Sequence, residues 1–276
     1  MAISPEIAQT VDAGGIATNV HIRGEGPPVV LLHGSGPGVT AWANWRLTIP
    51  ALVEHGFRVI APDAVGFGYT QRPADNTYSK ERWLSHLEGT LDALSLEQVD
   101  LVGNSFGGAL ALAFAATRPK RVRRLVLMGA VGTSFPITEG LDKVWGYEPS
   151  LANMKGLLDV FAHDRDLVND ELAQLRYEAS IRPGFQASFS AMFPAPRQRW
   201  VDALATDPAV IRGVAHRTLI VHGREDKVIP LAASLQLADL LPEMELHVFG
   251  HCGHWTQIEH AGRFVDLVAG FFHAQK

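Results

Sequence analysis

The sequence predicts an α/β protein with a mostly parallel, doubly wound sheet and one inserted helical segment. Two observations lead to this fold class. Short apolar runs, typical of strands buried on both faces, alternate with helical patterns along most of the chain. The alternation stops over residues 133–208 and then resumes. We therefore expect one core domain, residues 1–132 and 209–276, with residues 133–208 inserted as a helical lid over the strand tips.

The first half of the chain supplies the expected edge of the sheet. Ile16–Arg23 is predicted to be an edge strand, and the apolar run 28–33 a fully buried one. A helix is expected over 41–54 and a strand over 57–62. In the next helix, 79–94, leucines at spacings of three and four predict one face packed on the sheet.

The second half repeats the alternation on either side of the insertion. A strand that begins at Val99 leads through a glycine-rich turn into a helix ending near Thr117, and another strand covers 124–129. Within the insertion, prolines separate helical stretches, of which 151–161 and 169–180 are the clearest. The alternation then resumes with a strand at 217–223, a helix at 231–240, a strand at 245–249 and a closing helix at 256–272.

Composition limits the class of protein. With 276 residues, 47% of them hydrophobic, the chain can bury a large core. Its net charge of −5 offers no basic footprint for nucleic acid or membrane, so a small-molecule partner is expected. The single cysteine, Cys252, excludes an intrachain disulfide and fits a reducing compartment. No targeting signal or membrane span is recognisable in the sequence, and we expect a cytoplasmic protein.

The turn after the strand at Val99 carries the strongest chemical signal. Gly103, Ser105 and Gly107 match the pattern G-x-S-x-G, in which a strained turn between a strand and a helix lifts a serine nucleophile out of the sheet. The pattern alone is common by chance. Here the strand, turn and helix occur in the order that the motif requires, which favours Ser105 as a nucleophile.

A serine nucleophile needs a base and a carboxylate, and both follow later strands. Ligand sites in open parallel sheets lie beyond the carboxyl ends of the strands. Asp226 follows the strand at 217–223 and His254 follows the last strand, in the chain order Ser, Asp, His. Imidazole can take the serine proton, and a carboxylate fixes its tautomer. We therefore predict Ser105, Asp226 and His254 as a catalytic triad.

Other acids and histidines compete for these roles. Asp63 also ends a strand but precedes the serine, and Glu225 adjoins Asp226. Among the histidines, His251 is the main rival of His254, whereas His260 falls within the predicted closing helix and His33 fits a structural donor. The histidines lack the spacing of a metal pair and Cys252 has no cysteine partner, so neither a metal nor a cofactor is expected.

The glycine-rich turn 34–38 follows a buried strand. It lacks the Gly-Lys-Ser/Thr of a phosphate-binding loop. We interpret it instead as a source of backbone N–H groups that face the serine, as an oxyanion hole requires.

Several of these segments together resemble the meta-cleavage product hydrolases, which are α/β-hydrolase enzymes that cut a carbon–carbon bond in ring-fission products of aromatic compounds. The similarity covers nearly the whole chain and is greatest to the 2-hydroxymuconic semialdehyde hydrolase group. The matching segments are His33–Gly38, Asn44–Arg46, Gly103–Gly108, Ser180–Phe185 and Cys252–Trp255.

This resemblance implies a substrate and a set of contacts. The substrate would be a 2-hydroxy-6-oxohexa-2,4-dienoate, split into 2-hydroxypenta-2,4-dienoate and a small carboxylic acid. The resemblance also implies a homo-oligomer, with a dimer as the expected form. The backbone N–H groups of Ser35 and Phe106 would hold the oxyanion at C6. The resemblance assigns the remaining substrate contacts to Gly34, Asn44, Asn104, Trp145, Arg182 and Trp255. Arg182 would bind the carboxylate or 2-oxo end, with a lid-to-core ion pair as its alternative role.

Three questions stay open at the level of sequence. The size of the C6 substituent is undetermined, and attack can proceed through a serine acyl-enzyme or through water activated by His254. A carboxylesterase would share the triad, and a non-catalytic receptor of the same fold would have lost part of it. Haloalkane dehalogenases and epoxide hydrolases of this fold carry aspartate at the elbow, so Ser105 argues against both.

Overall fold

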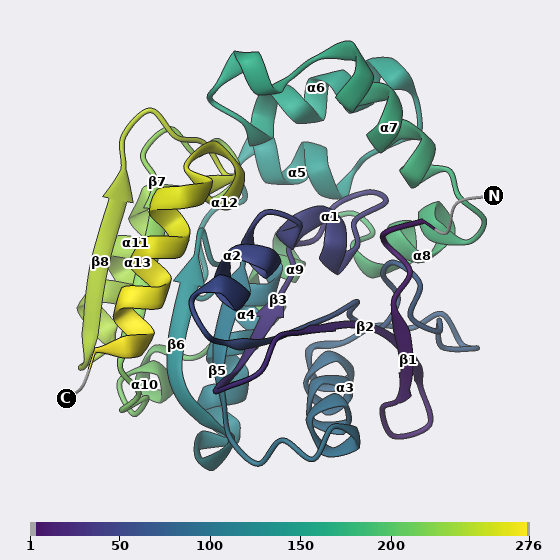
Figure 1. Ribbon diagram of the computed structural model, residues 1–276. Helices are drawn as coiled ribbons and strands as arrows, with labels where there is room; N and C mark the ends of the chain where they lie inside the picture. The colour runs from purple at the N-terminus through teal and green to yellow at the C-terminus, as the bar shows by residue number, and fades with distance from the viewer. Residues whose placement is uncertain (1–3, 275–276) are drawn as a thin grey trace.

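The computed structural model describes residues 4–274, and its centre is an eight-stranded sheet with the order β1-β2-β4-β3-β5-β6-β7-β8 (Figure 1). Residues 1–3, at the start of the stretch inspected for a targeting signal, lie outside the described part. The strands are β1 Gln9–Asp12, β2 Ala17–Arg23, β3 Pro28–Leu32, β4 Arg58–Pro62, β5 Val99–Asn104, β6 Val122–Met128, β7 Thr218–Gly223 and β8 Met244–Phe249.

Most of the sheet is parallel, as the apolar runs predict. Strands β4, β3, β5, β6, β7 and β8 pair in parallel, and β5 and β7 are buried along their whole length. The antiparallel pairs are β1 with β2 and β2 with β4. The predicted edge strand β2 is therefore internal, and β1 forms the edge. β1 escaped prediction because its four residues are mostly exposed and lack an apolar pattern.

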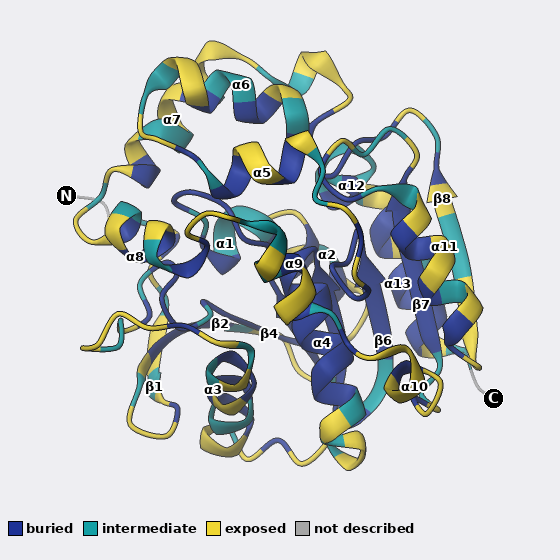
Figure 2. Cartoon of the chain, turned by 180° about the vertical axis from the view of Figure 1, so that it is seen from behind, coloured by how far each residue is buried: buried dark blue, intermediate teal, exposed yellow. Residues whose placement is uncertain are grey.

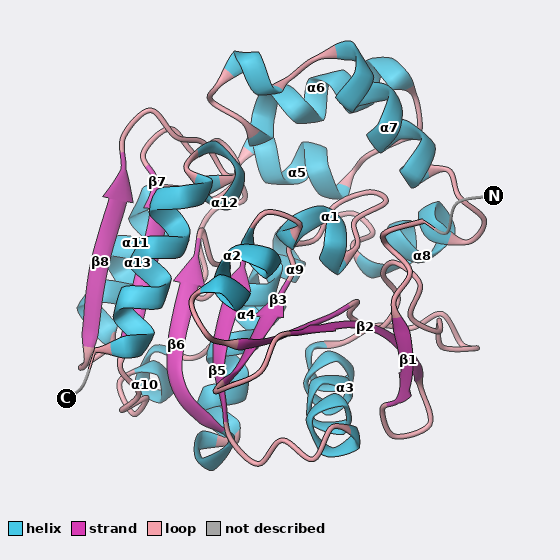
Figure 3. Ribbon diagram, viewed as in Figure 1, coloured by secondary structure: helices cyan, strands magenta, loops and turns pink. Residues whose placement is uncertain are grey.

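Helices cover both faces of the sheet and create two cores (Figure 3). One core joins the sheet to α3 Lys80–Ala93, α4 Phe106–Thr117 and α11 Leu231–Leu240. The other joins it to α1 Ala41–Trp45, α2 Thr48–Glu54 and α13 Ala261–His273. Successive strand residues alternate between the two, since Leu101 belongs to the first core and Val102 to the second. This is the doubly wound arrangement that the sequence predicts.

Two helices that were predicted as continuous are split. The stretch 41–54 forms α1 and α2, because Pro50 has no N–H to bond the carbonyl oxygen of Arg46. The closing stretch forms α12 Thr256–Glu259 and α13. Between them, His260 leaves helical geometry with φ −126° and ψ 42°, and its ring stacks on Phe249 at 5.1 Å. His260 is thus a packing residue at a helix junction.

The segment between β6 and β7 is helical, and in residues 129–217 the structure contains no strand. Its helices are α5 Glu139–Trp145, α6 Leu151–Phe161, α7 Asp170–Ser180, α8 Phe185–Met192, α9 Gln198–Leu204 and α10 Pro208–Ile211. Helices α5, α6 and α7 lie above one end of the sheet (Figure 1), and their outer faces are exposed while the central strands are buried (Figure 2). The lid boundaries at 133 and 208 stay a prediction. Within residues 4–274, no helix is both long and apolar enough to cross a membrane.

Candidate active site

Ser105 occupies a strained turn between β5 and α4. Its φ of 52° and ψ of −113° lie in a region that residues with a side chain rarely adopt. Two backbone hydrogen bonds to the neighbouring strand end hold it there. The Ser105 N–H donates to Met128 O at 2.8 Å, and the Ser105 carbonyl accepts from the Val131 N–H at 3.1 Å. These bonds to the end of β6 and the residues after it therefore stabilise the strained conformation of Ser105.

The tightness of the turn accounts for the glycines around the serine. A Cβ atom at Gly103 would lie 2.4 Å from Gly107 O, and a Cβ atom at Gly107 would lie 2.2 Å from Leu32 O. Both contacts are with backbone, which cannot move aside cheaply. The pattern G-x-S-x-G is thus a packing requirement of this turn.

Asp226, which follows β7, and His254, which follows β8, form a bonded pair. His254 Nδ1 and Asp226 Oδ2 are 2.7 Å apart, and Asp226 Oδ1 accepts from the N–H groups of Val228 at 2.7 Å and Ile229 at 3.0 Å. Burial alone would raise the pKa of the Asp226 carboxyl, but the charge and hydrogen bond of His254 hold that pKa below its ordinary value. Asp226 is therefore an anion that orients His254.

The same pair reaches the end of the strand that anchors Ser105. A Cβ atom at Gly129, the residue after Met128, would lie 3.3 Å from both His254 Nδ1 and Asp226 Oδ2. No hydrogen bond links the Ser105 hydroxyl to His254 in the described part of the chain. The contact between nucleophile and base stays a prediction.

The competing acids serve other contacts. Asp63 is fully buried and accepts from Ala41 N at 2.6 Å and Tyr69 N at 2.9 Å, and burial raises the pKa of its carboxyl to about 6. Glu225 accepts from Cys252 N at 2.9 Å and pairs with Arg224. Neither carboxylate bonds a histidine.

The rival His251 is exposed and has a positive φ of 55°. It makes no hydrogen bond to a carboxylate among residues 4–274. His254, by contrast, is 4% exposed. Its ring is bonded to Asp226, and its backbone N–H donates to Phe161 O of α6 at 2.7 Å. Of the two histidines, His254 is the one bonded to a carboxylate, Asp226, and its role as the base stays a prediction.

The lid also contacts the loop of His254 through Glu259 of α12. Its Oε1 accepts from Gly253 N at 2.9 Å, and its Oε2 accepts from His163 N and Asp164 N, both at 2.8 Å. One carboxylate thus joins the end of α6 to the residue that precedes His254.

The glycine-rich turn presents free N–H groups next to the elbow. A Cβ atom at Gly34 would lie 3.5 Å from Ser105 Cβ. Within the described chain, the N–H groups of Ser35 and Phe106 have no acceptor. His33 fixes the turn, since its Nδ1 lies 2.8 Å from Gly34 O and its Nε2 accepts from Ala64 N at 3.0 Å. Burial lowers the pKa of His33 to about 4, so the ring is neutral and structural.

A small cavity of about 50 Å³, here called the cleft, adjoins this turn and His254. Asn44 and Asn104 line it, and the Nδ2 atom of each is buried and has no hydrogen-bond partner among residues 4–274. The Asn44 amide is oriented by its Oδ1, which accepts from Gly34 N at 3.2 Å. The lining residues are Gly34, Ser35, Gly36, Pro37, Val39, Asn44, Asn104, Met154, Leu158, Phe161, Arg176, His254 and Trp255.

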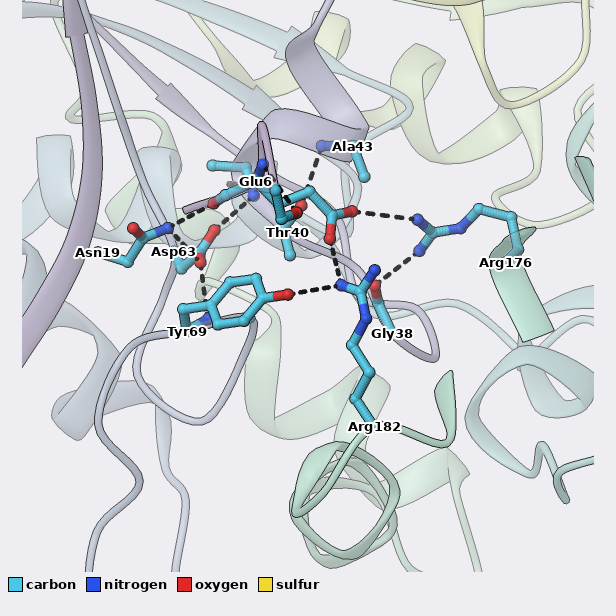
Figure 4. A network of polar contacts seen from close by, with 12 residues as sticks. Glu6, Asn19, Gly38, Thr40, Ala43, Asp63, Tyr69, Arg176 and Arg182 are labelled. Atoms are coloured by element: carbon cyan, nitrogen blue, oxygen red, sulfur yellow. Dashed lines mark hydrogen bonds and ion pairs between the residues drawn. The ribbon is translucent and has the colours of Figure 1, made fainter. Parts of the chain in front are cut away.

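Two of the predicted substrate contacts, Arg182 and Trp145, are not among the residues that line the cleft. Arg182 bonds Glu6 of the N-terminal segment and donates to Tyr69 Oη at 2.9 Å (Figure 4). This is the lid-to-core ion pair that the sequence left as its alternative role. The arginine that lines the cleft is Arg176.

Sequence reasoning missed Arg176. Its guanidinium donates to Gly38 O at 2.7 Å and lies 3.9 Å from a carboxylate oxygen of Glu6 (Figure 4). Burial lowers its pKa to about 10, which leaves a cation at neutral pH. A signal was present, because Arg176 lies three residues after Ala173 and four before Ser180, on the buried side of α7.

Trp145 of α5 packs against the glycine-rich turn 34–38. Its Nε1 donates to Ser35 Oγ at 2.9 Å, and its ring stacks on Phe193 with centroids 4.4 Å apart. The bulky side chain is 2% exposed and fixed at both ends. It occupies the space next to the glycine-rich turn.

Comparisons with known proteins agree with this geometry. The model of the alpha/beta hydrolase fold family matches residues 27–261. The chain is 65% identical to 2-hydroxymuconate semialdehyde hydrolase of Pseudomonas sp. strain CF600, over 97% of this chain and 94% of that protein. It is 63% identical to 2-hydroxy-6-oxo-2,4-heptadienoate hydrolase of Pseudomonas putida strain F1, over 99% of both. Among solved structures, a mutant of the meta-cleavage product hydrolase CumD from Pseudomonas fluorescens IP01, complexed with acetates, superimposes with a TM-score of 0.95 at 60% identity, covering 97% of this chain and 98% of the other.

Proposed function

The chain belongs to the meta-cleavage product hydrolases of the α/β-hydrolase superfamily, and from that premise we propose that Ser105, His254 and Asp226 are its catalytic triad. Its reaction is hydrolysis of the C5–C6 bond of a 2-hydroxy-6-oxohexa-2,4-dienoate. The observation that carries the assignment of residues is the bonded His254–Asp226 pair, with its 2.7 Å contact, beside a strained serine and two unbonded N–H groups.

The reaction needs two anions to be stabilised. Carbon is a poor leaving group, so the dienol must first become its keto tautomer by moving the 2-hydroxyl proton to C5. When the C5–C6 bond breaks, its electron pair passes into a dienolate with negative charge on the 2-oxygen. Water supplies a hydroxyl to C6, giving the carboxylic acid, and its proton returns to the 2-oxygen. The nucleophile at C6 is Ser105, followed by hydrolysis of an acyl-enzyme, or water activated by His254.

The oxyanion that forms at C6 would be held by the N–H groups of Ser35 and Phe106. Both donors lack an acceptor among residues 4–274, and a preorganised donor of this kind contributes about 10²–10³ in rate. His33 supports this role indirectly, because its contact with Gly34 O at 2.8 Å keeps the turn in place.

The dienoate end would lie against Asn44, Asn104, Trp255 and the backbone at Gly34. The two unpartnered amide Nδ2 atoms are donors for its oxygens. We propose Arg176, in place of Arg182, as the cation for the carboxylate or 2-oxo group, because Arg176 lines the cleft and Arg182 is paired with Glu6. A guanidinium can bind such groups with two parallel hydrogen bonds.

The C6 substituent would be small. Trp145, fixed between Ser35 and Phe193, is buried next to the turn whose Ser35 N–H would hold the C6 oxyanion, and its bulk would limit the room for a C6 substituent there. This favours hydrogen or a short alkyl group, as in 2-hydroxymuconic semialdehyde and its 6-alkyl analogues, over an aryl group.

Two expectations about the protein's setting remain proposals. We propose that the chain acts in the cytoplasm, which fits its single, fully buried thiol at Cys252. We also propose a homo-oligomer.

Residues 133–208 would act as a lid. They supply Phe161 and Arg176 to the lining of the cleft, so closure of the lid would complete the site.

A direct experiment compares yellow ring-fission products from catechol, 3-methylcatechol and 2,3-dihydroxybiphenyl as substrates, with loss of colour as the readout. We expect the first two to have the higher kcat/KM and the phenyl-bearing product the lowest. A chromogenic carboxylic ester assayed in parallel separates this function from that of a carboxylesterase. Higher kcat/KM for the ester than for every dienoate would contradict the proposal.

A further inference from the structure

A second cavity, here called the outer cavity, adjoins the cleft and has a volume of about 300 Å³. It lies between the N-terminal segment at Glu6, helix α1, helix α7 and the start of α12. The two cavities have four lining residues in common, namely Val39, Asn44, Arg176 and Trp255. These side chains therefore form a partition between the cleft and the outer cavity.

Exposure indicates that this partition is where the cleft communicates with solvent. The four shared residues are half-buried, whereas every other residue that lines the cleft is buried. The lining of the outer cavity also includes Arg46, which is exposed, and Leu175, which is 55% exposed. Exposure thus rises from the buried His254 to the half-buried partition and then to these exposed residues of the outer cavity.

The outer cavity has the chemistry expected for an apolar anion. Three leucines, Leu167, Leu172 and Leu175, contribute to its lining. Its charged lining residues are three arginines, Arg46, Arg176 and Arg182, and one carboxylate, Glu6. Figure 4 shows Glu6 between Arg176 and Arg182, so a positive excess remains after this pairing. The chain as a whole carries −5, and a local positive site would offset the repulsion that an anionic substrate meets.

We propose that the outer cavity is the route by which the anionic dienoate reaches the cleft and by which the dienoate product leaves it. The inference rests on the proposed function, because that function supplies an anionic, partly apolar ligand. It adds a claim about the path, which the reaction chemistry does not require. A route differs from a binding site in its kinetics: narrowing it slows association and dissociation alike and leaves the equilibrium constant unchanged.

The first test narrows the route with Leu172→Trp. Leu172 lies on α7, is half-buried, and lines the outer cavity but not the cleft. In a Ser105→Ala background, stopped-flow absorbance of the dienoate gives kon and koff without turnover. We expect both to fall at least about tenfold while their ratio, Kd, changes less than twofold. The matched control is Leu235→Trp, at a 49% exposed leucine of α11 that lines neither cavity.

The second test alters charge and does not depend on packing. Arg46→Gln removes an exposed cation from the outer cavity, and Arg199→Gln, at an exposed arginine of α9, makes the same change in net charge elsewhere. We expect Arg46→Gln to lower kon about two- to fivefold at low ionic strength. The difference should disappear near 1 M salt, where the screening length is about 3 Å. Arg199→Gln should leave kon unchanged.

Two results would overturn the proposed route. An unchanged kon in folded Leu172→Trp, together with an unchanged kon in Arg46→Gln, would show that ligand enters elsewhere. A changed Kd with kon preserved would make the outer cavity part of the binding site. Failure of the wild type to decolorise any dienoate would instead contradict the proposed function, and this is measured first and separately.

Discussion

Replacing Arg176 and Arg182 in turn separates substrate binding from structural support. Arg176→Gln removes the guanidinium that lines the cleft. A charge-assisted hydrogen bond contributes about 1.5–3 kcal/mol, which corresponds to a loss of about 10- to 150-fold in kcat/KM for the dienoate. The same change removes the contact with Gly38 O at 2.7 Å, so a neutral ester should also lose some activity. The ratio of dienoate to ester activity is therefore the informative quantity, and it should fall at least about fivefold.

Arg182→Gln should behave differently because its partners are Glu6 and Tyr69, outside the cleft. Its loss leaves the buried Glu6 carboxylate with only the longer 3.9 Å contact to Arg176. An incompletely paired buried group costs about 1–3 kcal/mol, and each kcal/mol lowers Tm by about 2–4 °C in a chain of this size. We expect a lower Tm with equal, small losses on both substrates.

The assay uses one preparation of each variant for three measurements: loss of dienoate colour, release of chromophore from a neutral ester, and the thermal midpoint. Arg176→Lys is the matched control, since lysine keeps the positive charge but cannot make the two parallel hydrogen bonds of a guanidinium. Its dienoate rate should lie between those of Arg176→Gln and the wild type. For Arg182, the double variant Glu6→Gln/Arg182→Gln should be more stable than Arg182→Gln alone, because no unpaired carboxylate remains.

The opposite pattern would refute the roles proposed for Arg176 and Arg182. If Arg182→Gln lowers dienoate turnover selectively, and Arg176→Gln lowers Tm with no change in the activity ratio, then Arg182 is the substrate cation and the ion pair with Glu6 opens during catalysis. Equal effects of both variants on both substrates would remove the cation from the binding model altogether.

Three further outcomes follow from the site and the buried histidines. Ser105→Ala should lower kcat by about 10⁶-fold while dienoate binding stays measurable by its absorbance; retention of more than a tenth of the activity would end its assignment as nucleophile. His254→Ala should be nearly as damaging and His251→Ala should not, and the reverse order in the same colour assay would transfer the role of base to His251. Burial lowers the pKa of His86 from 6.5 to about 4. As the pH falls, the His86 ring is therefore protonated in the unfolded chain before it is protonated in the folded one. The free energy of unfolding consequently decreases between pH 6.5 and pH 4. His86→Gln should therefore reduce the slope of unfolding free energy against pH in this window by up to one proton, worth about 3 kcal/mol in total; an unchanged slope in urea titrations would contradict this.

The elements that were predictable from sequence are those whose own residues carry the signal. The buried runs of β3, β5 and β7 and the periodic leucines of α3 are local patterns, and the elbow needs glycines within two residues of Ser105. The strand-tip rule then brings residues after different strands to one edge of the sheet, which is why Asp226 and His254 could be singled out.

What sequence could not supply depends on tertiary docking. Arg176 and Arg182 are six positions apart, and only the seating of α7 on the glycine-rich turn decides which one lines the cleft. The partner of Arg182 is Glu6, 176 positions earlier in the chain, and no local sequence pattern predicts such a pair. Strand β1 was missed because it is exposed and lacks an alternating pattern. The break between α1 and α2 was missed because Pro50, three residues into α2, was read as part of one continuous helix.

The bonds from His254 and Glu259 to the end of α6 have a consequence for protein engineering. The backbone of the predicted base is bonded to Phe161 of the inserted segment, and Glu259 bonds His163 and Asp164. The inserted helices therefore cannot be exchanged for those of a relative by joining the chains at the two ends of the insertion alone. A chimera that takes these helices from a relative to change substrate range will keep its base aligned only if residues 161–164 and Glu259 are inherited from the same parent.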